Sequence, residues 1–243
     1  TIAWERGGRL WVIDANGNKA PSPMLDLSEE VGAWRDHGLL GVALHPNFLN
    51  NGRIYLLYVV DRHHLLNFGT PQYNPNSNAY FAASIGRITR YTATAASNFT
   101  QVDPDSRLVL LGESITTGIP IVHQSHGVGT ILFGVDGTLL VSVGDSASYE
   151  SNDFGGQVSG GYVNQALADG ILTTKENVGA FRSQLVDSLC GKILRLNPET
   201  GDGVPSNPFF DSSAPRAPRS RVFALGLRNP FRMELIPGTG SHN

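Results

Sequence analysis

The segment HQSHGVGTILFGVDGTLLVSVGD, residues 123–145, contains residue types that could move a proton. Two histidines, His123 and His126, precede a glycine-rich apolar run, and Asp145 follows the next run. An imidazole is the side chain best suited to accept a proton near neutral pH. It is directed toward a substrate when a partner on its other ring nitrogen fixes the tautomer, and a carboxylate can be that partner. The segment therefore predicts a histidine–aspartate pair that acts as a general base.

A β-hairpin explains the separation of the two members of this pair. Residues 129–134 and 138–144 flank Val135-Asp136-Gly137, and an Asp-Gly turn between apolar runs is typical of a hairpin. Antiparallel strands return the chain to the side from which it came, so we expect residues 126 and 145 to lie close together. From the pattern alone, a loop histidine bonded to the backbone and a turn-closing Asp145 remain alternatives.

The composition restricts the class of protein. The 243 residues carry a net charge of −3 without a Lys/Arg run, which argues against a nucleic-acid partner. No apolar stretch approaches 18 residues, so we expect no membrane-spanning segment. The single cysteine, Cys190, excludes an internal disulfide framework. The 28 glycines and 14 prolines, with only 16% charged residues, favour a turn-rich β protein.

Strand patterns dominate the chain. The apolar runs 38–46 and 53–60 predict strands covered on both faces, whereas the alternation in 86–93 is typical of an edge or outer strand. Short helices are expected only within 162–172 and 176–189. Further strands are expected within 9–14, 129–134, 138–144, 191–201 and 221–227.

A loose repeat indicates how these strands are organised. A strand, an Asp/Asn-Gly turn or similar turn and a second strand recur near 9–22, 129–145 and 191–203. This predicts an all-β fold, a β-propeller of four-stranded antiparallel blades. With insertions at 61–85 and 146–190, residues 1–243 would supply three to four blades of a single propeller domain. Because the pattern is unfinished at its end, we expect an N-terminal fragment of a longer chain.

Four motifs, in this order, resemble the soluble glucose/sorbosone dehydrogenases, which are six-bladed propellers that use pyrroloquinoline quinone (PQQ). The resemblance places His126, rather than His123, at the catalytic position, and it places Asp145 at the family's spacing from it. The motifs are DHGLLGVALHPNFLNNGRIYLLYV (36–59), HGVGTILFGVDGTLLVSVGD (126–145), SLCGKILRLNP (188–198) and VFALGLRNPFRM (222–233).

The resemblance also implies roles for residues outside the hairpin. Arg228 and Asn229 would contact PQQ. Arg228 would also stabilise the negative charge that develops on a quinone oxygen, so it is expected to be a catalytic residue together with His126 and Asp145. Asp36 would line the sugar site, where many members have Gln or Glu. A Ca²⁺ ion is implied, but its ligands are unknown here. The family's calcium-binding carbonyls and later PQQ-binding Lys and Arg residues are expected after residue 243, and Thr130 stands where the family often has Arg.

The function implied by the resemblance is PQQ-dependent oxidation of an aldose C1 hydroxyl to the lactone. It implies a sugar substrate, an external electron acceptor and a periplasmic or secreted location. It further predicts that His126, Asp145 and Arg228 converge on one cavity.

Two alternatives stay open. One is a non-catalytic propeller that binds a protein or polysaccharide, as the hedgehog-interacting proteins do, although those are disulfide-rich. The other is a metal-dependent propeller lactonase, which would need converging carboxylates. The candidate carboxylates for such a metal site are scattered along the chain: Asp26, Glu30, Asp145 and Asp187.

Overall fold

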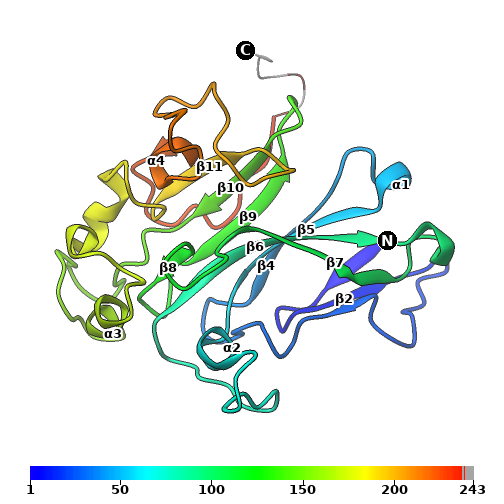
Figure 1. Cartoon of the computed structure of the whole chain (residues 1–243), viewed down its shortest axis with the longest axis horizontal. Coiled ribbons are helices and arrows are strands. Elements are labelled where there is room, and N and C mark those ends of the chain that lie inside the picture. Colours follow the sequence, from blue (N-terminus) through cyan, green and yellow to red (C-terminus); the bar gives the residue numbers. More distant parts are fainter. Residues whose placement is uncertain (237, 239–243) are drawn as a thin grey trace.

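Three antiparallel sheets hold most of the regular secondary structure in this computed structural model, which describes residues 1–236 and 238 (Figure 1). The first sheet has the strand order β1-β2-β3, and the third has the order β12-β11-β10-β9. The middle sheet has the order β4-β5-β6-β7, and β8 also pairs with β6. The sheets do not close on one another, and the helices are short. The predicted all-β architecture of antiparallel sheets is confirmed.

The elements follow one another in the order of the sheets. The first sheet contains β1 (Ile2–Trp4), β2 (Arg9–Val12) and β3 (Leu25–Asp26). The middle sheet contains β4 (Leu39–Leu44), β5 (Arg53–Val59), β6 (Ser84–Ala93), β7 (Val102–Leu111) and β8 (Ile119–Ile121). The third contains β9 (Val128–Phe133), β10 (Leu139–Val143), β11 (Lys192–Leu196) and β12 (Val222–Leu225). The helices are α1 (Phe48–Asn51), α2 (Arg62–Asn67), α3 (Val163–Ala168) and α4 (Pro218–Arg221), with 3₁₀ turns η1 (Ala95–Ser97), η2 (Thr174–Glu176) and η3 (Gly179–Gln184).

Strand β5 belongs to two hydrophobic cores. Successive side chains of a strand point to opposite faces of its sheet. Accordingly Ile54, Leu56 and Tyr58 pack in the core shared with the first sheet. Tyr55 and Leu57 pack in the core shared with the third sheet. The prediction that this run is covered on both faces is therefore confirmed, and the middle sheet lies between the other two.

Strand β6 corrects the prediction of an edge or outer strand at 86–93. It pairs with β5 on one side and with β7 and β8 on the other, so it is an interior strand. The alternation was misleading because Arg87 is buried together with its partners. The Arg87 guanidinium donates to the carbonyl of Gly112 and to the carboxylate of Glu30, which satisfies its charge inside the structure.

Two long connections lie where insertions were expected. The connection between β5 and β6 begins with α2, and the connection between β10 and β11 contains α3, η2 and η3. The helix expected within 176–189 is wrong in kind, because the chain forms 3₁₀ turns and Gly179 adopts φ +56°. Within the described residues, none of the helices has the length and apolar character needed to cross a membrane.

Candidate active site

Residues at the ends of β9, β10 and β12 converge on one site in the third sheet, where β11 lies between β10 and β12. Strands β9 and β10 are antiparallel, and Val128 at the start of β9 lies opposite Val143 at the end of β10. Beyond them the pairing continues, because Gly144 N–H donates to the Gly127 carbonyl and Ser146 N–H to the His126 carbonyl. The hairpin therefore places His126 beside Asp145, as its local pattern predicts.

His126 and Asp145 are in direct contact. The Nδ1 atom of His126 lies 3.2 Å from Oδ1 of Asp145. A carboxylate can only accept here, so Nδ1 carries the proton and the opposite nitrogen, Nε2, is left as an acceptor. The His126 side chain is 11% exposed, whereas the Asp145 side chain is 1% exposed. The buried carboxylate thus holds the tautomer that a general base requires.

The backbone around this pair is tightly constrained. His126 has φ +56° and Ser146 has φ +54°, a region that few residues other than glycine adopt. Gly144 packs directly against the main chain of His126, and a Cβ atom at this position would collide with the His126 carbonyl. The glycine of the Gly-Asp motif is therefore required by the close approach of two loops. Such strain is typical of a site whose geometry is held by its surroundings.

Arg228 reaches the site from the end of β12. Its Nη1 atom lies 2.8 Å and 2.7 Å from the two carboxylate oxygens of Asp145, and its Nη2 atom donates to the Ser148 carbonyl. The main chain adds a further bond, from Asp145 N–H to the Arg228 carbonyl. The structure thus brings together His126, Asp145 and Arg228. The resemblance predicts that these three residues converge, but it does not predict the direct ion pair between Arg228 and Asp145.

The charge of Asp145 is stabilised by its neighbours. Burial alone raises the pKa of this carboxyl, but the hydrogen bonds from His126, Arg228 and the Ala147 N–H outweigh it. The pKa of Asp145 consequently lies below its ordinary value, and the group is ionised at neutral pH. Because the Arg228 side chain is 47% exposed, this arginine also presents a cationic surface beside His126.

Asp36, Asn229 and Tyr149 are exposed residues around the site. The backbone N–H of Asp36 points to the Gln124 carbonyl at 3.5 Å, next to the loop that carries His126. Asn229 follows Arg228. The Tyr149 ring lies 6.4 Å from the His126 ring and is 55% exposed, and its hydroxyl accepts a hydrogen bond from Gln124. The sequence patterns did not indicate Tyr149, which lies in the connection after β10.

Two histidines near the site support the loop before β9. His123, which the resemblance assigns to the loop, is buried, and burial lowers its pKa. His37 is fully buried, and its Nε2 donates to the His123 carbonyl at 2.9 Å. Its Nδ1 has no hydrogen-bond partner among residues 1–236 and 238, and a Cβ at Gly127 would lie 2.8 Å from that atom. Burial lowers the pKa of His37 to about 4, so this imidazole is neutral at pH 7.

Arg182 is a supporting residue that the sequence did not reveal. Its guanidinium is fully buried and donates to the carbonyls of Asp145, Ser146 and Glu176, at 3.0, 2.8 and 3.4 Å. Lys192, also buried, donates to the carbonyl of Arg182 itself. Arg182 therefore ties the Asp145 turn to the β10–β11 connection, and Lys192 stabilises the segment that carries Arg182. Arg182 lies in the connection between β10 and β11, where no periodic pattern marks it.

Metal ligands are not gathered among the described residues. Residues 1–236 and 238 contain no group of three or more His, Cys, Asp or Glu side chains that could hold a metal ion. The predicted Ca²⁺ therefore stays a prediction without assigned ligands. The four carboxylates considered for a lactonase do not form a metal-binding group of three or more in this part of the chain.

Comparisons with known proteins identify relatives of this chain. It is 26% identical to the HIPL1 protein of Arabidopsis thaliana over 87% of this chain and 30% of that protein. It is 26% identical to the Hedgehog-interacting protein of Mus musculus over 94% of this chain and 27% of that protein. It is 22% identical to quinoprotein glucose dehydrogenase B of Acinetobacter calcoaceticus over 97% of this chain and 43% of that protein. The chain thus spans less than half the length of these relatives.

Solved structures share the fold. The structure of a glucose dehydrogenase from Thermus thermophilus, described as a putative oxidoreductase, matches with a TM-score of 0.62 and 27% identity, over 98% of this chain and 51% of that one. The PQQ-bound aldose sugar dehydrogenase of Streptomyces coelicolor matches with a TM-score of 0.58 and 22% identity, over 94% and 47% of the two chains. These matches agree with the prediction of β-propeller blades. The glucose/sorbosone dehydrogenase family model matches residues 1–241, and the chain belongs to that family.

Proposed function

We propose that this chain is part of a PQQ-dependent sugar dehydrogenase and supplies its general base. The reaction is oxidation of the C1 hydroxyl of an aldose to the lactone. The observation that supports this most is the contact of one carboxylate, Asp145, with both His126 and Arg228. A base, its orienting partner and a half-exposed cation then lie within one site. Oxidation of a hydroxyl-bearing carbon needs the removal of a proton and of a hydride.

His126 is assigned the removal of the proton. Nε2 is its free acceptor, because Nδ1 donates to Asp145. When Nε2 takes the proton from the C1 hydroxyl, the imidazolium that forms is stabilised by the ionised Asp145 carboxylate. A positioned base of this kind contributes about 10²- to 10⁴-fold to rate.

Arg228 and Asn229 fit one part of the cofactor. PQQ is an o-quinone with three carboxylates, and it would accept the hydride when bound. The Arg228 guanidinium is half-exposed next to His126, although Nη1 and Nη2 already donate to Asp145 and Ser148. Among the described residues, the Arg228 Nε–H has no hydrogen-bond partner and the face of the guanidinium has no aromatic partner. They can therefore donate to a planar anionic ligand and stack on it. Asn229 adds an exposed amide beside it.

The sugar is assigned to the rim formed by Asp36 and Tyr149. An exposed aromatic ring offers an apolar surface to the C–H face of a sugar, and carboxylates accept hydrogen bonds from its hydroxyls. Asp36 is exposed beside the His126 loop, and Tyr149 lies over the same loop.

The remaining parts of the proposal follow from the resemblance. The chain is assigned to a single propeller domain with insertions at 61–85 and 146–190, and Ca²⁺ is its second cofactor. When bound, PQQ would need an external electron acceptor to be reoxidised. The location is periplasmic or secreted, as for other enzymes that use this cofactor.

Spectral titration tests the proposal. The purified protein is titrated with PQQ and Ca²⁺, and glucose or another aldose is then added. We expect the quinone absorbance to fall on addition of sugar in the wild type and in a His45→Gln control. We expect His126→Gln to bind PQQ without reducing it.

A result in which the His126 variant reduces PQQ as fast as the wild type would overturn the assignment. If the chain binds no PQQ, the titration is repeated on a version extended with the rest of the natural protein. Binding and turnover by the longer chain support the proposal, whereas no binding by either form contradicts it.

A non-catalytic binding module is the second candidate. It is favoured by the similarity to the Hedgehog-interacting protein and to the HIPL proteins. Such a module has no need for a buried histidine–aspartate pair beside an exposed arginine. If neither form binds PQQ, a pull-down with the Tyr149→Ser variant as control would test whether the same rim binds a protein or polysaccharide.

A further inference from the structure

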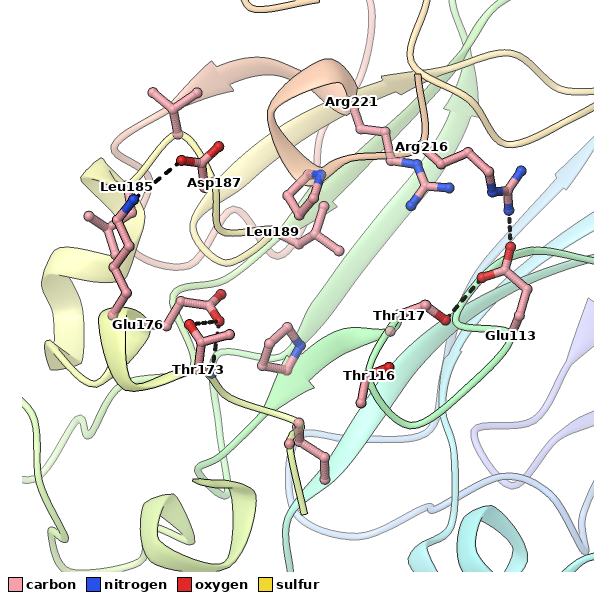
Figure 2. Close-up of a pocket in the computed structure, with 17 residues that line it drawn as sticks. Glu113, Thr116, Thr117, Thr173, Glu176, Leu185, Asp187, Leu189, Arg216 and Arg221 are labelled. Atoms are coloured by element: carbon pink, nitrogen blue, oxygen red, sulfur yellow. Dashed lines mark hydrogen bonds and ion pairs between the residues drawn. The ribbon is translucent and has the colours of Figure 1, made fainter. Parts of the chain in front are cut away.

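A cavity of about 500 Å³ lies apart from the candidate active site. Its walls come from the connection between β7 and β8, from two stretches of the β10–β11 connection and from the region around α4 (Figure 2). None of its lining residues belongs to the group formed by His126, Asp145 and Arg228. The volume is in the range of sites that bind small organic molecules.

Much of the wall is apolar. The apolar lining side chains are Pro120, Ile171, Leu185, Val186, Leu189 and Pro218. Three threonines add hydroxyl groups, namely Thr116, Thr117 and Thr173. A ligand of this cavity therefore has an apolar body, because a fully polar molecule would lose its hydration against such a wall.

Most of the charged groups on the wall already have partners. Glu113 pairs with Arg216, and Lys175 Nζ lies 3.5 Å from the Asp187 carboxylate. The Glu176 carboxylate accepts hydrogen bonds from the backbone N–H and the hydroxyl of Thr173, across the cavity from Arg221 (Figure 2). Glu113, Arg216, Lys175 and Asp187 are therefore neutralised in pairs, whereas Glu176 keeps its negative charge on the wall.

Arg221 is the exception. Its side chain is buried, and it donates only to carbonyl oxygens, from Nε to Gly201 at 2.8 Å and from Nη2 to Leu110 at 3.5 Å. Within the described residues no carboxylate forms an ion pair with its guanidinium. Burial, and then the neighbouring Arg216, lower the pKa of Arg221 to about 10, while the Asp202 carboxylate, which is not in hydrogen-bond contact with it, raises the pKa by less. The guanidinium is therefore charged at pH 7.

A buried charge without a counter-ion is costly, and an anion that fits beside it removes that cost. We propose that this cavity binds a small monocarboxylate with an apolar body, with the carboxylate on Arg221 and the body against the apolar wall. A single unpaired guanidinium matches a single negative charge. A dianion such as phosphate would need a second free cation and would face the Glu176 carboxylate.

Phenylacetate and its neutral counterpart 2-phenylethanol are suitable probes, because they share a ring and differ in charge. Calorimetric titration of the full chain should give a submillimolar Kd for phenylacetate and binding at least tenfold weaker for the alcohol. Arg221→Gln should weaken phenylacetate binding to the level of the alcohol. Equal affinity of the acid and the alcohol for the wild type would overturn the proposal.

Two tryptophan variants on one loop test the same cavity without changing Arg221, in case Arg221→Gln does not fold. Thr116 lines the cavity and is exposed, so Thr116→Trp should fill the cavity and abolish binding of phenylacetate. Ser114 is exposed on the same loop but does not line the cavity, so Ser114→Trp should bind like the wild type. Binding that survives Thr116→Trp, or that is lost equally in both variants, would contradict the assignment.

Discussion

The guanidinium of Arg228 contacts both oxygens of Asp145, whereas His126 contacts only Oδ1 of the same carboxylate. One buried carboxylate therefore contacts both an imidazole and a guanidinium. Any change in the charge of Asp145 acts on both neighbours together, so the three side chains function as a unit.

Replacing Asp145 by Asn should lower kcat for sugar oxidation by about 10²- to 10⁴-fold, because the amide no longer fixes the Nδ1–H tautomer of His126. The measurement is the rate of PQQ reduction at saturating sugar. Asp136→Asn is the matched control, since Asp136 lies at the turn of the same hairpin, away from the site. A kcat for Asp145→Asn within about twofold of this control would show that the carboxylate has no orienting role.

Replacing Arg182 by Met should lower the free energy of unfolding by about 3 kcal/mol, because three main-chain carbonyls lose a buried donor. Arg219→Met is the control, since Arg219 forms an exposed ion pair with Asp187 and its loss should cost about 0–1 kcal/mol. Urea unfolding measures both variants. Similar midpoints would mean that the Asp145 turn does not depend on Arg182.

A methyl group at position 144 should disturb the site directly. Gly144→Ala places Cβ against the His126 carbonyl, and we expect a loss of about 1–3 kcal/mol in stability together with loss of turnover. Gly7→Ala meets no atom within 4 Å, so its stability should change by about 0.5 kcal/mol or less. Thermal unfolding and the rate of PQQ reduction test the pair. An active, stable Gly144→Ala protein would contradict the close packing of the two loops.

The buried His37 predicts a dependence of stability on pH. The unfolded chain binds a proton on this residue below its ordinary pKa of 6.5, whereas the folded protein does so only near pH 4. The unfolded state thus binds more protons between these values, so stability rises with pH from 4 to 6.5. The contribution of His37 is at most about 3 kcal/mol, at about 1.36 kcal/mol per pKa unit.

Denaturant unfolding at pH 4.5, 5.5 and 7 measures this slope. His37→Gln should be less stable than the wild type at pH 7, and its stability should vary less over the interval. An unchanged slope in the variant would assign the pH dependence to other groups.

The parts of the site that are local in sequence could be predicted, and those that depend on distant contacts could not. The hairpin pattern brings His126 to Asp145 because strand pairing acts over a short segment. The contact of Arg228 with Asp145 depends on two further strands, β11 and β12, whose order in the sheet no local pattern encodes. Arg182 gives no signal because its role depends on burial of an irregular connection. The misassigned β6 shows the same limit. A polar/apolar pattern counts every arginine as exposed, whereas Arg87 is buried.

The separation of the site residues along the chain has a consequence for folding. His126 and Asp145 are 19 residues apart and meet within one hairpin, whereas Arg228 lies 83 residues after Asp145. During synthesis the hairpin can therefore form well before Arg228 leaves the ribosome. Until β12 pairs with β11, the Asp145 carboxylate lacks its partner Arg228 and is hydrated instead, and the edge of β11 stays unpaired. Docking of β12, the edge strand of the third sheet, therefore completes both the sheet and the site, and it can occur only late in synthesis.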